Sequence, residues 1–338
     1  MRHWQQRSKR LLALAGAALA AMMALTPLAS AGPPGHPVRV GVLDLIAPSF
    51  DPAVNPVARE LSEGLRALGY TPGRDVLFEY KSAQGNRDLL PLLAAELVQS
   101  KVDVLVTLNL AATLAAAKAT KTVPIVMRGI ADVVETGLIA SLARPGGNLT
   151  GLAVNAAEIA AKRVQLLQEA VPGLARVGVL WNARAPAMAL AFQNIEKASP
   201  QLGVILQSVR VTGSDDFDQA FAAIESGHPD GLVVLYGPLR GSDLPRIVEF
   251  VTQHKLPTIF EPGQGVLGGG LMEFGPDNLQ MARRAAAYID KIANGADPAT
   301  LPVEEPTLFE LVINLQAAKS MGFEVPHSLL MRADRVIE

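Results

Sequence analysis

The chain has 338 residues, of which 49% are apolar, and a formal net charge of -2. This length allows two domains of ordinary size with substantial cores. The charge argues against the broad basic face that nucleic-acid binding needs, and the absence of cysteine excludes disulfides, thiol catalysis and Cys-ligated metals.

The N-terminus has the layout of a secretory signal. Four basic residues precede an uncharged apolar run at 11–25, and Ala29-Ser30-Ala31 fits a cleavage site. The alternative is a transmembrane anchor, but the run is short for a bilayer span and Pro27 follows it. We therefore predict that residues 1–31 are a signal peptide, which leaves 26 basic and 32 acidic residues, a charge of -6. Without an N-terminal Cys, the mature protein should be a free periplasmic protein and not a lipoprotein.

The first half alternates apolar strand patterns with helical ones. Helical spacing follows the first strand at 54–68, the second at 89–98 and the third up to about Thr120, and a fourth helix is expected around 136–142. This alternation predicts an α/β fold with a parallel, doubly wound sheet. The predicted strands are 37–45, 76–80, 103–108 and 123–127.

A break at Pro145-Gly146-Gly147 separates two similar halves. The first half opens with Val40-Gly41-Val42-Leu43, and the second opens with Val177-Gly178-Val179-Leu180. The repeat predicts two lobes joined by three crossovers, near 141–154, Gly275 and 302–306. Lobe 1 would comprise residues 38–153 and about 276–302, and lobe 2 would comprise 154–275 and about 303–338. The second half has predicted strands at 176–181, 204–211, 231–236, 258–260, 270–274 and 309–314 and a long helix at 278–292.

Ligands of open α/β sheets bind beyond the carboxyl ends of the strands, so the loops there supply the candidate site. Arg128 could clamp a carboxylate, Glu261 or Glu273 could hold an ammonium, and aromatic residues could pack an apolar group. The alternative is that Arg128 and Asp132 pair with each other or with a nearby loop, and that the aromatic residues belong to the core. The candidate ligand-binding residues are Leu45, Asn109, Leu110, Ala111, Arg128, Ala131, Asp132, Asn182, Arg184, Ala185, Tyr236, Glu261, Glu273 and Phe274.

Nothing in the sequence indicates catalysis, a metal or a cofactor. The five His residues are scattered, and no G-x-S-x-G elbow is present. The G-x-G-x-x-G match at 263–268 leads directly into another strand pattern, so it lacks the helix that a dinucleotide site requires.

Three stretches resemble the tryptophan/tyrosine-type family of ABC-transporter substrate-binding proteins. They are 123–151, which contains VPIV and SLARPGGNLTG, 301–315 (LPVEEPTLFELVINL) and 329–338 (LLMRADRVIE). The resemblance covers essentially the whole mature chain. It implies a type I periplasmic-binding-protein fold, in which two Rossmann-like lobes close like a hinge on a small molecule. It also implies a membrane permease and a cytoplasmic ATPase as partners.

The sequence departs from that family at the strand ends. Leu108-Asn109-Leu110-Ala111 replaces Gly-Gly-Thr-Pro, and Arg184 and Glu273 introduce charges. We therefore expect a monomeric, non-enzymatic solute-binding protein for a small organic solute, an amino acid or another carboxylate-bearing molecule. The alternatives are a sensory protein that presents a solute to a membrane receptor, and a periplasmic enzyme on the same fold.

Overall fold

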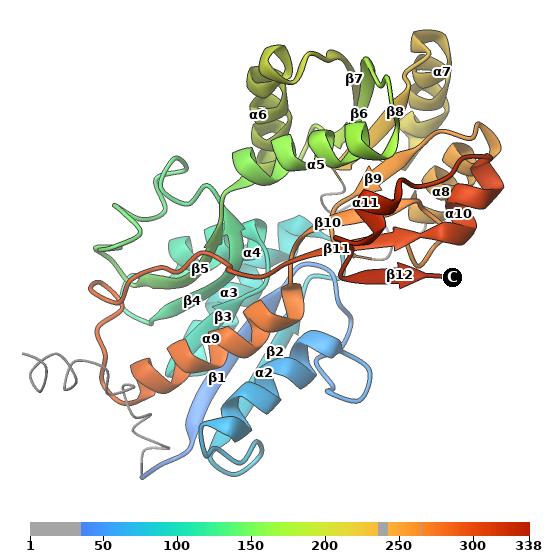
Figure 1. Ribbon diagram of the computed structural model, residues 1–338. Helices are drawn as coiled ribbons and strands as arrows, with labels where there is room; N and C mark the ends of the chain where they lie inside the picture. The colour runs from blue at the N-terminus through green and yellow to red at the C-terminus, as the bar shows by residue number, and fades with distance from the viewer. Residues whose placement is uncertain (1–34, 236–242, 264) are drawn as a thin grey trace, which may run out of the picture.

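The computed structural model describes residues 35–235, 243–263 and 265–338. The predicted signal peptide and Tyr236 lie outside these residues. Figure 1 shows two sheets in separate halves of the molecule, with extended segments running between them. Within the described ranges, no helix is long and apolar enough to cross a membrane.

The first sheet contains five strands in the order β2-β1-β3-β4-β5, and all its pairs are parallel. Helices follow its strands as the periodicity predicts. The strands are β1 (Val38–Asp44), β2 (Val76–Ser82), β3 (Val104–Thr107), β4 (Ile125–Ala131) and β5 (Leu149–Val154). The helices with this sheet are α2 (Pro56–Ala67), η1 (Arg87–Leu89), α3 (Leu90–Gln99), α4 (Leu110–Ala119) and α9 (Asn278–Ala293).

Each face of this sheet has its own hydrophobic core, because successive side chains of a strand point to alternate faces. Val104 and Val106 pack in the core that includes α2 and α9 residues, whereas Leu105 packs in the core that includes α3 and α4 residues. Successive side chains of a strand point to opposite faces, so a continuous apolar run fills both cores.

The second sheet contains seven strands in the order β12-β11-β10-β9-β8-β6-β7. It is mixed, because β11 runs antiparallel to β10, whereas the sequence predicted parallel sheets throughout. The strands are β6 (Arg176–Asn182), β7 (Ile205–Val211), β8 (Gly231–Leu235), β9 (Thr258–Phe260), β10 (Met272–Pro276), β11 (Phe309–Asn314) and β12 (Arg335–Ile337). The helices are α5 (Ala156–Ala170), α6 (Pro186–Leu202), η2 (Ser214–Asp216), α7 (Phe217–Gly227), α8 (Asp243–Gln253), α10 (Leu315–Met321) and α11 (His327–Leu330).

The repeated Val-Gly-Val-Leu reflects a structural duplication. The order β7-β6-β8-β9-β10 repeats β2-β1-β3-β4-β5, so Gly41 and Gly178 lie on equivalent strands. A Cβ on Gly41 would lie 2.8 Å from a Leu105 methyl, and one on Gly178 would lie 2.9 Å from a Leu232 methyl. Both glycines therefore make room for a Leu on the neighbouring strand.

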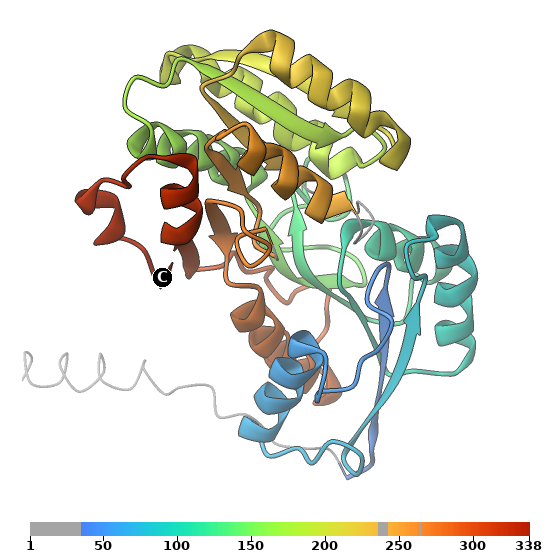
Figure 2. The same cartoon turned by 90° about the vertical axis from the view of Figure 1, so that its right-hand side faces the viewer.

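The chain passes between the sheets three times. It leaves the first sheet from β5 into α5, returns from β10 into α9, and leaves again before β11. The last passage runs beside β5 as far as Glu304, whose N–H donates to the Gly151 carbonyl at 3.0 Å and whose carbonyl accepts from Ala153 at 2.9 Å. In Figure 2, α9 descends to the half that holds β1, and the C-terminal segment stays with the other half.

The helix predicted around 136–142 is not present. Residues 133–140 form turns and bends, and the break at Pro145 does not end a helix. Asp132 and Gly137 have positive φ angles of 50° and 70°, which an α-helix cannot contain. The apolar spacing that suggested a helix instead places Ile139 in the core and packs Leu138 against it.

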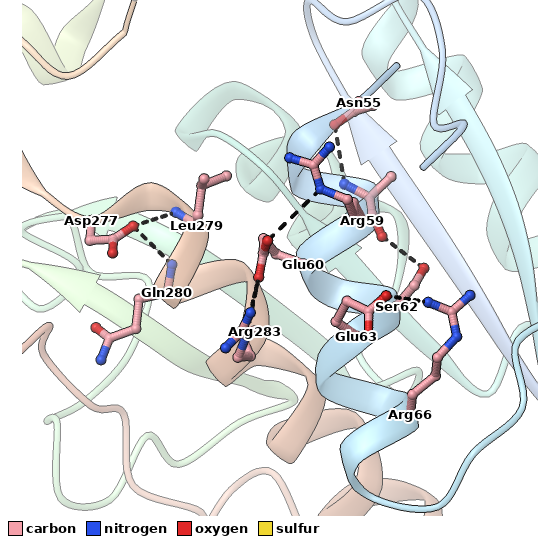
Figure 3. A network of polar contacts seen from close by, with 11 residues as sticks. Asn55, Arg59, Glu60, Ser62, Glu63, Arg66, Asp277, Leu279, Gln280 and Arg283 are labelled. Atoms are coloured by element: carbon pink, nitrogen blue, oxygen red, sulfur yellow. Dashed lines mark hydrogen bonds and ion pairs between the residues drawn. The ribbon is translucent and has the colours of Figure 1, made fainter. Parts of the chain in front are cut away.

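The packing of α2 against α9 requires a glycine. A Cβ on Gly64 would lie 2.6 Å from the Arg283 carbonyl oxygen and 2.8 Å from the Ala286 Cβ. Figure 3 shows the polar contacts between the two helices, where the Glu60 carboxylate contacts the Arg283 guanidinium at 2.5 Å.

We expect Gly64→Ala to destabilise the protein by about 2 kcal/mol, because two helix backbones must separate. The measurement is urea unfolding followed by circular dichroism. Glu63→Ala is the matched control on the same helix, since Glu63 is exposed and its salt bridge is with the nearby, exposed Arg66. The control should change stability by less than about 0.5 kcal/mol, and equal effects of both substitutions would contradict the packing argument.

Candidate functional site

A cavity of about 360 Å³ lies at the carboxyl ends of the strands, between elements of the two sheets. Its wall is mainly apolar, with a few polar groups. The lining residues are Leu45, Ile46, Arg87, Leu108, Asn109, Leu110, Ala111, Leu114, Gly129, Ile130, Ala131, Val154, Ile159, Arg163, Ala185, Met188, Ala191, Glu261, Pro262, Pro276, Asn278 and Met281. This volume is at the lower end of the range for small-molecule sites.

Asp44 organises the wall on the first sheet. Its buried carboxylate accepts hydrogen bonds from the N–H groups of Leu45, at 2.6 Å, and Ala47, at 3.1 Å. It also accepts from the Asn109 side-chain amide at 2.9 Å. The Asn109 side-chain oxygen in turn caps α4 by accepting from Ala112 at 2.9 Å. One carboxylate therefore fixes two strand-end loops against each other.

The first turn of α4 faces the cavity through Leu110 and Ala111. The N–H groups at the start of a helix have no partner within the helix, and the Asn109 cap serves Ala112. The N-terminus of α4 therefore presents N–H donors and a partial positive charge to the cavity.

Arg163 organises the wall on the second sheet. It lies on α5, and its side chain is 5% exposed. Its Nε donates to the Phe274 carbonyl at 2.8 Å, and its Nη1 contacts Glu261 Oε1 at 3.3 Å. Burial lowers the pKa of Arg163, and the nearby Glu261 carboxylate opposes that shift. Arg163 thus ties α5 to the end of β10, where the chain leaves for α9.

Arg87 extends from η1 along the cavity wall to the opposite half of the molecule. Its Nη1 donates to the Arg184 carbonyl at 3.1 Å, in the loop between β6 and α6. Burial lowers the pKa of Arg87. This hydrogen bond directly joins the two halves of the molecule at the cavity.

The structure brings half of the predicted site residues together. Seven of the fourteen line the cavity, and they come from both halves: Leu45, Asn109, Leu110, Ala111, Ala131, Ala185 and Glu261. Tyr236 lies outside the described residues. The other six lie off the cavity wall: Arg128, Asp132, Asn182, Arg184, Glu273 and Phe274.

The side-chain contacts of these six explain their positions. Asn182 accepts from the N–H of Arg184 within its own loop, and the Arg184 side chain is exposed. Asp132 has partners within the protein. The Phe274 ring stacks on Phe309, with centroids 5.8 Å apart.

Arg128 braces the cavity from behind and does not line it. Its Nη1 lies 3.3 Å from the carbonyl oxygen and from Oδ1 of Asn278, and its Nη2 lies 3.4 Å from the Leu108 carbonyl. Burial lowers the pKa of Arg128, and the charge of Asp44 opposes the shift. The expected carboxylate clamp is therefore replaced by contacts that hold the ends of β3 and α9 together.

Glu273 is a buried carboxylate on β10 that lies off the cavity wall. Its side chain is 5% exposed and lies 4.0 Å from the Arg335 guanidinium. Its Oε2 has no hydrogen-bond partner among the described residues. Burial raises the pKa of Glu273 above the usual value for a glutamate. Ionisation of this group therefore costs more in the folded than in the unfolded protein.

We expect Glu273→Gln to stabilise the protein by about 1 kcal/mol at pH 7.5, since it removes a buried charge with an unpaired oxygen. The pKa of Glu273 is higher in the folded than in the unfolded protein. The cost of ionising Glu273 in the folded protein is therefore absent below the unfolded-state pKa and grows as pH rises through the folded-state pKa. The gain should therefore vanish near pH 4. Melting temperatures at the two pH values measure it, with exposed Glu305→Gln as control; a gain that persists unchanged at pH 4 would contradict the assignment.

Sequence reasoning missed the polar and apolar residues that helices contribute to the wall. Arg163 lies within the apolar stripe of α5, four residues after Ile159, and this spacing places both on one helix face. An arginine within an apolar helix stripe was the sequence signal that could have identified Arg163 as a site residue. Arg87 and Met188 carried no comparable signal, because their position depends on how the two halves meet.

These features define a two-lobed α/β binding protein of the periplasmic type, with its cavity between the lobes. Residues 40–337 match the family described as ABC transporter substrate binding protein, and the chain belongs to that family. It is accordingly a solute-binding protein of an ABC transporter, from a family that binds its solutes without converting them. The family and the fold class predicted from the sequence are thus confirmed.

Similar proteins come from several bacteria. A tyrosine-binding protein of Clostridioides difficile is 24% identical over 291 residues, which are 85% of this chain and 81% of that one. A crystal structure of a conserved domain protein from Vibrio cholerae has a TM-score of 0.80 and 28% identity, and covers 88% of this chain and 99% of that one. An ABC domain from Streptococcus pneumonia in complex with L-Trp has a TM-score of 0.81 and 24% identity, with 89% and 100% covered.

Proposed function

We propose that this protein captures a small organic solute, with a carboxylate and an apolar body, and delivers it to an ABC permease powered by a cytoplasmic ATPase. The observation that carries the proposal is the cavity of about 360 Å³, which takes its wall from both sheets. The apolar lining suits the body of the solute, whereas Arg87 and the first turn of α4 suit an anionic group.

Aromatic amino acids are the first members of this class to test. The tyrosine-binding relative and the L-Trp complex support them as candidates. Purified mature protein should show a higher melting temperature with a ligand of this class, because a solute that binds only the folded state stabilises it. The panel is aromatic amino acids, aromatic and branched carboxylic acids, aliphatic amino acids and sugars. A shift with sugars alone would contradict the proposal.

Closure of the two lobes on the solute is the proposed mode of capture. Three passages between the sheets provide the hinge, and the hydrogen bond from Arg87 to the Arg184 carbonyl is available when the lobes are close. Small-angle scattering should show a smaller radius of gyration when ligand is added. An unchanged radius at saturating ligand would argue against hinge closure.

The proposed location is the periplasm, as a free protein. This proposal is supported by the basic and apolar pattern of residues 1–31 and by the absence of any cysteine to acylate. Fractionation of cells that express the full chain, with mass spectrometry of the N-terminus, tests it; recovery in the cytoplasm with an intact N-terminus would contradict it.

A further inference from the structure

The cavity wall carries more positive than negative charge. Arg87 and Arg163 are cationic, and Glu261 is the one carboxylate among the described lining residues. Glu261 is engaged by Arg163 at 3.3 Å. Among the described residues, the Arg87 guanidinium has one hydrogen bond, to the uncharged Arg184 carbonyl. The cavity therefore keeps one cation without an anionic partner.

The other carboxylates near the cavity are occupied. Asp44 accepts from the N–H groups of its own loop, from Asn109, and from the Tyr80 hydroxyl at 3.3 Å. Asp132 lies off the wall and has partners within the protein. Residues 236–242 and 264, which the structure does not describe, contain no Asp or Glu in the sequence. These residues can add no carboxylate to the cavity.

An ammonium group inside this cavity would therefore meet no unengaged carboxylate. Burying such a charge without a partner costs considerably more than burying a neutral group. A carboxylate would instead find the remaining N–H donors of Arg87 and the first N–H groups of α4, at Leu110 and Ala111. The rest of the solute would contact apolar side chains such as Ile130 and Met188.

We infer that the cavity selects apolar carboxylic acids that lack an ammonium group over the corresponding amino acids. The inference rests on the proposed function, because it concerns the same cavity. It narrows the ligand from carboxylate-bearing solutes in general to aromatic or branched monocarboxylates. Arg87 becomes the residue that holds the carboxylate, whereas the lack of an unengaged carboxylate on the wall disfavours the ammonium group.

The test compares probes that differ in the ammonium group alone. Isothermal titration of the dialysed mature protein would use L-tyrosine against hydroxyphenylpropionate, and L-tryptophan against indolepropionate, with tyramine as the probe that lacks a carboxylate. We expect each desamino acid to have a Kd at least about tenfold lower than its amino acid, and tyramine to be the weakest. An amino acid that binds as tightly as its desamino partner would overturn the inference and leave the proposed function intact. Binding of sugars alone would overturn both.

A variant pair assigns the carboxylate contact. Arg87→Gln should weaken binding of the desamino acids about tenfold, since it removes a charge-assisted contact. Arg144→Gln is the matched control, because Arg144 is exposed and lies off the cavity wall, and it should leave the Kd unchanged. Wild-type affinity in the Arg87→Gln variant would overturn the role of this residue.

Discussion

Gly151→Ala is expected to destabilise the protein by about 3–5 kcal/mol. Gly151 lies in β5, and its φ angle is 121°, in a region that side-chain-bearing residues rarely adopt. An added Cβ would lie 2.3 Å from the Met127 carbonyl oxygen and 2.8 Å from its amide nitrogen. Neither atom can move without breaking the pairing of β4 with β5. Urea unfolding measures the effect.

Gly147→Ala is the control for this substitution. Gly147 lies in the loop just before β5, its φ angle is not in the left-handed region, and nothing lies within 4 Å of the Cβ it would gain. Stability should change by less than about 1 kcal/mol in this variant. If Gly151→Ala were as mild as the control, β4 and β5 could not be packed as closely as the structure has them.

Arg163→Met is expected to cost about 2–4 kcal/mol of folding stability. The substitution removes a charged hydrogen bond to the Phe274 carbonyl and takes the cationic partner from Glu261. Adding Glu261→Gln should recover part of the loss, because the double variant no longer contains a Glu261 carboxylate that has lost its cationic partner. Chemical unfolding of the two single variants and the double variant gives the coupling.

Lys162→Met is the matched control for Arg163→Met. Lys162 is the preceding cation on the same helix, and its Nζ lies 3.5 Å from Gln165 Oε1, at the limit of a hydrogen bond. We expect a change of less than about 0.5 kcal/mol. Additive effects in the double variant, with no recovery, would show that Arg163 and Glu261 do not stabilise each other.

The duplicated α/β plan could be predicted because it depends on local patterns. Apolar runs of four to seven residues, followed by helical spacing, predict strands and helices whatever surrounds them. The predicted long helix after 278 is α9, and the strand predicted as the last one is β11, although the short β12 follows it. The lobe boundaries stay a prediction. The helix predicted at 136–142 is absent for a local reason. The positive φ angles at Asp132 and Gly137 are incompatible with a helix, but they do not alter the spacing of apolar residues from which the helix was predicted.

The candidate site could be predicted only as a set of loops. The rule for strand ends indicated the right edge of each sheet, and Asn109, Ala185 and Glu261 do line the cavity. It could not tell which side chains turn inward. Asn182 turns back into its own loop, and Glu273 points across β11 toward Arg335. Which residues contact the solute stays a proposal.

The sequence by itself determined the two α/β halves, their common opening motif and the family. Each depends on local periodicity or on motifs that are contiguous in the chain. The tertiary structure alone decided the charge balance of the cavity, because Arg87, Arg163 and Glu261 come from η1, α5 and the residue after β9. Such segments meet only where the strand ends of the two sheets lie opposite each other. Side-chain direction and interlobe packing, which no single segment encodes, therefore determine what this protein binds.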